Sequence, residues 1–278
     1  MGQNSQIKQK SKPRFPRTRT TIVDQNGWTH IASRRGNSNL SQVHDQLIPA
    51  EIPSGLTIEK LTEQFIRHKK MWQESQTWKA LESAILRTTD RTSMTTITAT
   101  WNCVCIALGS PSGLLRGGHV DRRGISLFQL AALVSILEVL ADLSNISGKC
   151  FAQDPVFNEL DRELLNSLGF EVVNGSKAFE LVHESTFLYA PGAERIHLLT
   201  LLPLNPQIFF GGPLDTSHSI IDLENGENEQ SVLTNFTRKM QSINLSEFNP
   251  NPASFWRSSF YWRSSSNQAS PTELGCSS

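Results

Sequence analysis

Five short apolar segments, each followed by a turn rich in glycine, proline or polar residues, constrain the fold of this 278-residue chain most strongly. They lie at 97–108, 149–153, 170–173, 186–189 and 208–210. Segments with helical patterns separate most of them, at 126–142, 155–168 and 196–204. Apolar strands without a polar face are typical of a parallel sheet that helices cover on both sides. With right-handed crossovers, the pattern predicts an α/β, Rossmann-like, doubly wound parallel sheet of about five strands in the order 3-2-1-4-5.

Capping signals mark the expected helix starts. Ser126 is followed three residues later by Gln129, which is the spacing of a capping box and predicts a helix start at Ser126. Asp154 and Pro155 offer an N-cap and a first-turn proline for the next helix. On that helix we expect the acidic side chains to form a solvated face near the positive helix end. They are Glu159, Asp161 and Glu163.

Two amphipathic helices are expected before the sheet, because apolar residues recur at helical spacing from Thr57 onward. The first set is Ile58, Leu61, Phe65 and Trp72, and the second, after a break near Ser75, is Trp78, Leu81 and Ile85. The stripe is more typical of core packing than of a ligand site.

The charge is distributed unevenly although the formal total is zero. Residues 1–50 are basic and poor in aliphatic side chains, which predicts a mostly disordered arm. Residues 51–215 hold the predicted helices and sheet. Residues 216–278 are acidic and then rich in serine and aromatic residues, which predicts a tail.

The cysteines and the hydropathy pattern indicate a protein of the cytoplasm, the nucleus or both. Cys103, Cys105, Cys150 and Cys276 form no CxxC pair, so we expect reduced thiols without a metal site. The most apolar stretch, 127–143, is interrupted by polar residues and is shorter than the ~18 apolar residues of a membrane span. We therefore expect no membrane partner.

Several short motifs occur in the order seen in one known family. They are Ile106-Ala-Leu-Gly-Ser-Pro-Ser112, Gln129-Leu-Ala131, Asp154-Pro-Val-Phe157, Leu168-Gly169 and Thr186-Phe-Leu-Tyr-Ala-Pro191. Over about 97–212 the chain resembles the SRR-like family, named for "sensitivity to red light reduced". The resemblance implies a Rossmann-like domain without a settled enzymatic activity. It also implies regulatory roles, including circadian or light responses and control of haem biosynthesis.

A candidate ligand site lies where the first two strands of the predicted sheet end. The turn containing Gly109, Ser110 and Ser112 offers amides and hydroxyls that suit a phosphate, a carboxylate or a ribose, although glycine and proline also simply end strands. Asp154 is placed to bind ribose hydroxyls, but an Asp before Pro is also a helix cap, and this is the explanation that the sequence favours. Arg116, in the following loop, is a candidate clamp for an anion, although a charge on a long loop is more often simply solvated.

The sequence is compatible with three functions. The first is a non-enzymatic regulatory or ligand-sensing protein that binds a small anionic or nucleotide-like ligand and recruits protein partners through its tails. The second is an S-adenosylmethionine-dependent transferase, suggested by the glycine turn and the acid after the second strand. The third and least favoured is nucleic-acid binding by the basic arm. The sequence identifies no cofactor, and we lean against an enzyme.

Overall fold

A computed structural model describes residues 19–23, 29–33, 48–91, 101–115, 118–143, 148–214 and 226–263. The chain divides into two compact units, 1–46 and 47–278. In the first, β1 (Arg19–Val23) pairs antiparallel with β2 (Thr29–Ser33). Most of the arm predicted over 1–50 lies outside the described residues, but these two strands are regular structure that the prediction of disorder missed.

The second unit begins with the two predicted helices. They are α1 (Ile58–Glu74) and α2 (Gln76–Arg91), and the chain breaks between them at Ser75 as predicted. Thr57 caps α1 through a bond from the amide of Lys60 to its hydroxyl. The apolar stripe is a packing surface, because Leu61, Phe65 and Trp72 are all buried.

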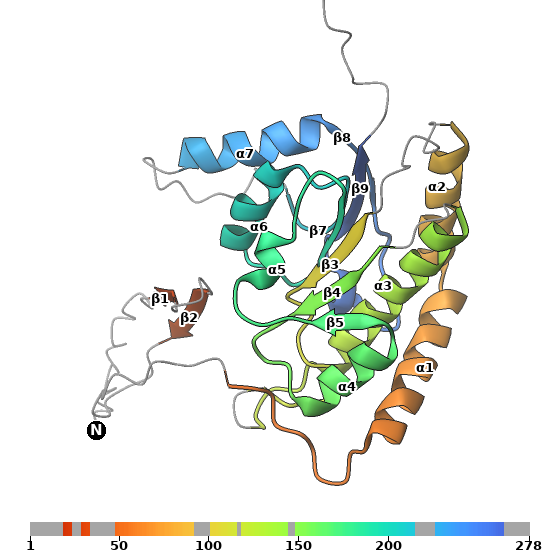
Figure 1. The fold of residues 1–278 in the computed structure, drawn as a ribbon, viewed down its shortest axis with the longest axis vertical. Helices are drawn as coiled ribbons and strands as arrows, with labels where there is room; N and C mark the ends of the chain where they lie inside the picture. The colour runs from red at the N-terminus through yellow and green to blue at the C-terminus, as the bar shows by residue number, and fades with distance from the viewer. Residues whose placement is uncertain are drawn as a thin grey trace, which may run out of the picture. The chain divides into compact units, whose positions relative to one another are not determined.

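The predicted parallel sheet is confirmed (Figure 1). Its strands are β3 (Asn102–Ile106), β4 (Cys150–Gln153), β5 (Phe170–Val172), β6 (Thr186–Ala190) and β7 (Ile208–Gly211). The strand order is β5-β4-β3-β6-β7 with parallel pairing throughout, which is the order 3-2-1-4-5. The carboxyl ends of these strands therefore lie along one edge of the sheet.

Two further strands extend the sheet, so the prediction of a tail is wrong for 226–263. After α7 (Gly226–Arg238), β8 (Met240–Asn244) and β9 (Ser259–Arg263) add antiparallel strands in the order β7-β9-β8. The aromatic residues of β9 explain the outcome: Phe260 packs into the core on one face and Tyr261 into the core on the other. The serine-rich composition of this region predicted no strand, although β9 is buried on both faces.

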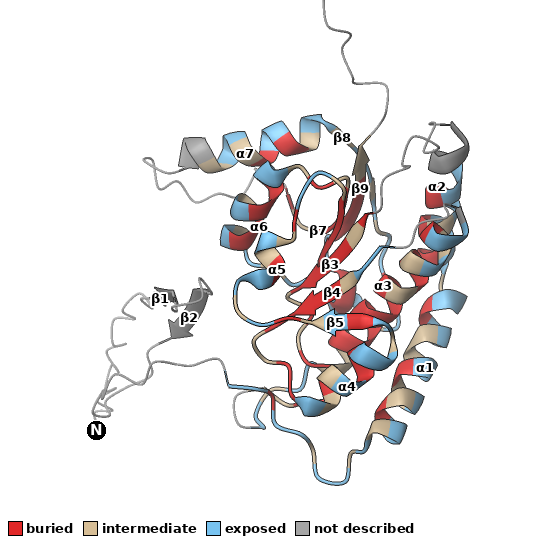
Figure 2. Ribbon diagram, viewed as in Figure 1, coloured by how far each residue is buried: buried red, intermediate tan, exposed pale blue. Residues whose placement is uncertain are grey.

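Helices cover both faces of the sheet. One face carries α1, α2, α3 (Arg123–Leu143) and α4 (Glu159–Ser167), and the other carries α5 (Lys177–Glu180), α6 (Arg195–Leu201) and α7. A 3-10 turn (Leu202–Leu204) continues α6. Figure 2 shows the buried residues concentrated on the central strands and on the inner sides of α1 and α3.

The central helix α3 starts earlier than predicted, at Arg123 instead of Ser126. Gln129 does not close a capping box, because its Nε2 donates to the carbonyl of Ser254, 2.8 Å away, in the turn before β9. By length and composition, Arg123–Asp142 could cross a membrane, but 61% of the apolar window is buried inside this fold. Its apolarity is that of a core helix packed against α1, α2 and the sheet.

The burial of β9 gives a stability test. Phe260→Ala removes a ring that is 4% exposed, and we expect it to lower the free energy of unfolding by about 3–5 kcal/mol. Trp256→Ala, at a side chain that is 65% exposed, is the matched control and should cost less than about 0.5 kcal/mol. Urea denaturation of the full chain measures both. Equal small effects would mean that the sheet does not depend on β9.

Candidate functional site

The candidate site lies at the carboxyl edge of the parallel sheet, where β3 and β4 end. In open α/β sheets, ligands bind along this edge near the point where the strand order reverses, here between β3 and β6. The backbone is unusual there, because Ala107 has a φ of +54°. Gly192, after β6, approaches it so closely that a Cβ would lie 2.4 Å from the Ala107 carbonyl oxygen. Only glycine allows the turns after β3 and β6 to meet in this way.

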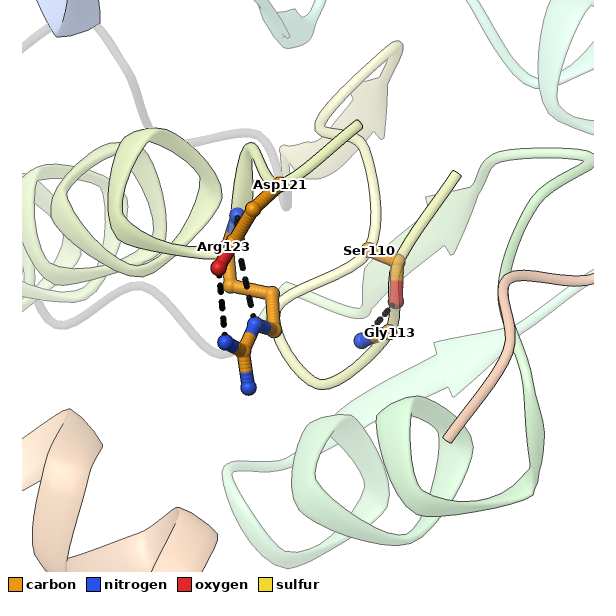
Figure 3. Close-up of polar contacts among 4 residues, drawn as sticks. All are labelled: Ser110, Gly113, Asp121 and Arg123. Atoms are coloured by element: carbon orange, nitrogen blue, oxygen red, sulfur yellow. Dashed lines mark hydrogen bonds and ion pairs between the residues drawn. The ribbon is translucent and has the colours of Figure 1, made fainter. Parts of the chain in front are cut away.

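The turn after β3 binds a carboxylate of the chain itself. Ser110 donates its hydroxyl to Oδ2 of Asp161 at 2.6 Å, and the amide of Ser112 donates to Oδ1 at 2.9 Å. The Ser112 hydroxyl donates to Oδ1 of Asn158, also at 2.9 Å. The amide of Gly113 closes the turn by donating to the Ser110 hydroxyl (Figure 3). Asp161 thus occupies the donors that the sequence suggested for an external anion.

Asp154 links the ends of β3 and β4. Its Oδ2 accepts from the amide of Gly109 at 2.8 Å and its Oδ1 from the amide of Val156 at 3.1 Å. The prediction that Asp154 caps the following helix is wrong. The helix α4 begins at Glu159, and its N-cap is Asn158, which forms a reciprocal capping box with Asp161.

The prediction of a solvated acidic face is also wrong for Asp161. Glu159 and Glu163 are exposed, but Asp161 is fully buried. The signal for this was present in the sequence, since an acid three residues after Asn158 has the spacing of a capping box. Choosing between Asp154 and Asn158 as the cap required the structure, because both residue types serve that role.

A segment before α1 covers this network. Asn158 donates its side-chain amide to the carbonyl of Ala50 at 3.0 Å, and the amide of Ala50 donates to the carbonyl of Val156. Gly113 packs so tightly beneath that a Cβ would lie 2.4 Å from the Cβ of Ala50. Ser110 and Ser112 are consequently buried, at 2% and 0% exposure.

Burial changes the electrostatics of the two carboxyl groups. Desolvation raises the pKa of Asp154 to about 6, against the opposing effect of its two amide donors, and the charge of Asp161 adds to the rise. Desolvation also raises the pKa of Asp161, although its hydrogen bonds to Ser110, Asn158 and Ser112 oppose this. Asp154 therefore titrates close to neutral pH.

The long loop before α3 is partly described. Arg116 lies outside the described residues, so its role as an anion clamp stays a prediction. Arg123 pairs with Asp121 through Nη2 at 2.7 Å and Nε at 3.0 Å, and its amide donates to the same carboxylate (Figure 3). The guanidinium lowers the pKa of Asp121. This pair stabilises the start of α3 locally.

Of the predicted site residues, the structure brings Gly109, Ser110, Ser112 and Asp154 into one network and adds Asn158 and Asp161. Their role as ligand contacts stays a prediction, as the donors of the turn bind protein groups. Over the described residues, no cluster of three His, Cys, Asp or Glu side chains suits a metal ion.

Comparisons with known proteins give a family and no closer relative. The family model described as the SRR1 domain matches residues 62–262, which include most of α1, the seven-stranded sheet except the last residue of β9, and the network at its carboxyl edge. No curated protein and no solved structure matches the chain.

The Asp161 network predicts a large and specific loss of stability. Asp161→Ala leaves buried donors on Ser110, Ser112 and Asn158 without an acceptor, so we expect the free energy of unfolding to fall by about 3 kcal/mol or more. Glu163→Ala, on the exposed side of the same helix, should change it by less than about 0.5 kcal/mol. Thermal or urea unfolding measures both variants. Equal losses in the free energy of unfolding would contradict the stabilising role of the network.

Asp154 predicts a pH dependence with a defined sign. Its carboxyl binds a proton more tightly in the folded state, with a pKa of about 6, than in the unfolded state, where 3.8 applies. The folded state is therefore favoured below pH 4, and this contribution is lost as the pH rises through 6, by roughly 3 kcal/mol in all. The unfolding free energy of wild type should therefore fall relative to that of Asp154→Asn as the pH rises from 4 to 7, by roughly 2–3 kcal/mol. A difference that stays constant from pH 4 to 7 would contradict the assignment.

Proposed function

The chain belongs to the SRR1 domain family, and from this premise we propose that it is a regulatory protein that senses a small nucleotide-like ligand and does not catalyse a reaction. The ligand site proposed is the edge of the sheet beside Asp154, with Gly109, Ser110 and Ser112 fixing the turn and Arg116 contacting the anionic part of the ligand. The ligand would alter the protein surface to which partners bind.

One observation carries the proposal: a carboxylate stands at the end of β4 with acceptor capacity to spare. A carboxylate has about four acceptor positions, and the amides of Gly109 and Val156 use two of those on Asp154. Paired hydroxyl groups, such as those of a ribose, are donors that suit the remaining positions. Asp154 as a whole residue is 9% exposed, so it lies at the boundary of the buried network.

The environment of the nucleophilic groups supports a regulatory role over a catalytic one. The hydroxyls of Ser110 and Ser112 donate to Asp161 and Asn158 inside the fold. Burial raises the pKa of the Cys103 and Cys105 thiols, so both stay protonated and weakly nucleophilic. Buried reduced thiols also support the proposal of a cytoplasmic or nuclear location.

A second candidate is an S-adenosylmethionine-dependent transferase, which the position of Asp154 after the second strand also favours. This cofactor carries a ribose, and its binding alone does not separate sensing from catalysis. Release of S-adenosylhomocysteine in the presence of cell extract would favour the transferase.

Calorimetry with the full chain tests the proposal. We expect heat on titration with adenosine or adenosine monophosphate, and no heat with 2′,3′-dideoxyadenosine, which lacks both hydroxyl donors. Asp154→Ala should weaken binding by about ten-fold or more, because it removes a charged acceptor. The control variant Glu159→Gln, at an exposed acid of α4, should bind as wild type. Absence of heat at millimolar ligand, or equal binding by Asp154→Ala, would overturn the proposal.

A further inference from the structure

A cavity lies at the carboxyl edge near β8 and β9, at the end of the strand order that is far from β4. It has a volume of about 360 Å³ and lies between the end of β7 and the junction of β8 with β9. Because β9 runs antiparallel to β7, with Gly211 opposite Ser259, the start of β9 reaches the same edge as the ends of the parallel strands. The volume is at the lower end of the range of small-molecule sites.

The turn at the cavity wall has a strained residue in an exposed position. Phe255 to Ser258 forms a β-turn closed by the Ser258 amide and the Phe255 carbonyl at 3.1 Å. Trp256 has φ −57° and ψ 115°, and Arg257 has a φ of +54°, as in a type II turn. The third position of such a turn normally requires glycine. Holding an arginine there costs stability, and residues in this condition concentrate at ligand sites.

The charge and hydrogen-bonding groups of the cavity favour an anion. Among the described residues that line it, Arg257 is the one with a formal charge. Tyr261 also lines it, and burial raises the pKa of its hydroxyl, although a hydrogen bond with the Ser259 side chain opposes the rise. Ser259 donates its hydroxyl to Oδ1 of Asn244 at 2.8 Å, a bond that does not use the two N–H donors of the Asn244 amide. Leu214 and Leu245 supply an apolar wall.

From this we infer that the cavity beside Arg257 is a binding site for a small organic anion, one with a carboxylate or phosphate head group and an apolar body. Arginine suits this role because its planar guanidinium presents paired donors to an oxyanion. The guanidinium carbon lies 5.5 Å from the ring centroid of Trp256, which holds the side chain at the rim.

The inference is independent of the site at Asp154. Four inter-strand spacings separate β4 from β9, which is roughly 19 Å at about 4.8 Å each. A ligand of the size of this cavity does not reach both. Adenosine should therefore neither compete with the anion nor depend on Arg257.

The test is binding of phenyl phosphate and of benzoate to the full chain, followed by amide shifts in NMR spectra and by calorimetry. Inorganic phosphate and benzyl alcohol are the comparison probes, since each has one half of the proposed ligand. We expect phenyl phosphate or benzoate to bind about ten-fold or more tightly than either comparison probe, because both the charge and the apolar body contribute. The stronger of the two identifies the head group. Equal binding of benzyl alcohol would overturn the inference, because the charge would then contribute nothing.

Arg257→Gly separates binding from folding. It removes the cation and also relieves the positive φ, so the variant should unfold at a temperature equal to or higher than wild type while binding falls by about ten-fold or more. Arg257→Lys keeps the charge and should retain part of the affinity. Arg238→Ala, at an exposed arginine of α7 outside the cavity, should bind as wild type. Unchanged binding by Arg257→Gly would refute the site even if Asp154 proved to bind nucleosides.

Discussion

Hydrogen bonds to the buried carboxylate of Asp161 hold the carboxyl edge of this sheet together. This carboxylate accepts from the hydroxyl of Ser110 and the amides of Ser112 and Asn158, and so joins the turn after β3 to the start of α4. A buried charge without a cation is costly unless donors surround it. Here the donors of a strand-ending turn meet that need, and the segment at Ala50 covers the result. The edge is therefore held rigidly by the chain itself.

The two buried carboxylates change which ligand groups the carboxyl edge can bind. Turn amides at the end of a first parallel strand commonly hold the anionic groups of ligands. In this chain Asp154 and Asp161 take that place, and the pKa values of both are raised by burial. What the edge presents near β4 is an acceptor for hydroxyl donors. Near β9, the described residues include a cation, Arg257, that lines a cavity of about 360 Å³.

Aromatic contacts join the N-terminal helix α1 to the segment between β8 and β9. Trp72 of α1 packs against Phe255, with ring centroids 4.7 Å apart, and against Phe248 at 5.4 Å. These contacts fix the segment between β8 and β9 beneath the N-terminal helices. They position the Phe255–Ser258 turn and hence the wall of the Arg257 cavity. Aromatic pairs of this kind add to the stabilisation that burial provides.

The parallel sheet, its strand order and the two preceding helices could be predicted from the sequence, because apolar periodicity and turn residues are local signals. The sequence also placed Gly109, Ser110, Ser112 and Asp154 at one edge. The tertiary structure decided that Asp161 is buried, that Asn158 is the cap, and that 226–263 completes the sheet. Those outcomes depend on partners distant in the chain: Ala50 and Ser110 for the network, and β7 and Trp72 for the C-terminal strands. A local sequence pattern does not identify partners that are distant in the chain. For this reason the sequence predicted a solvated Asp161, although its hydrogen-bond donors bury it.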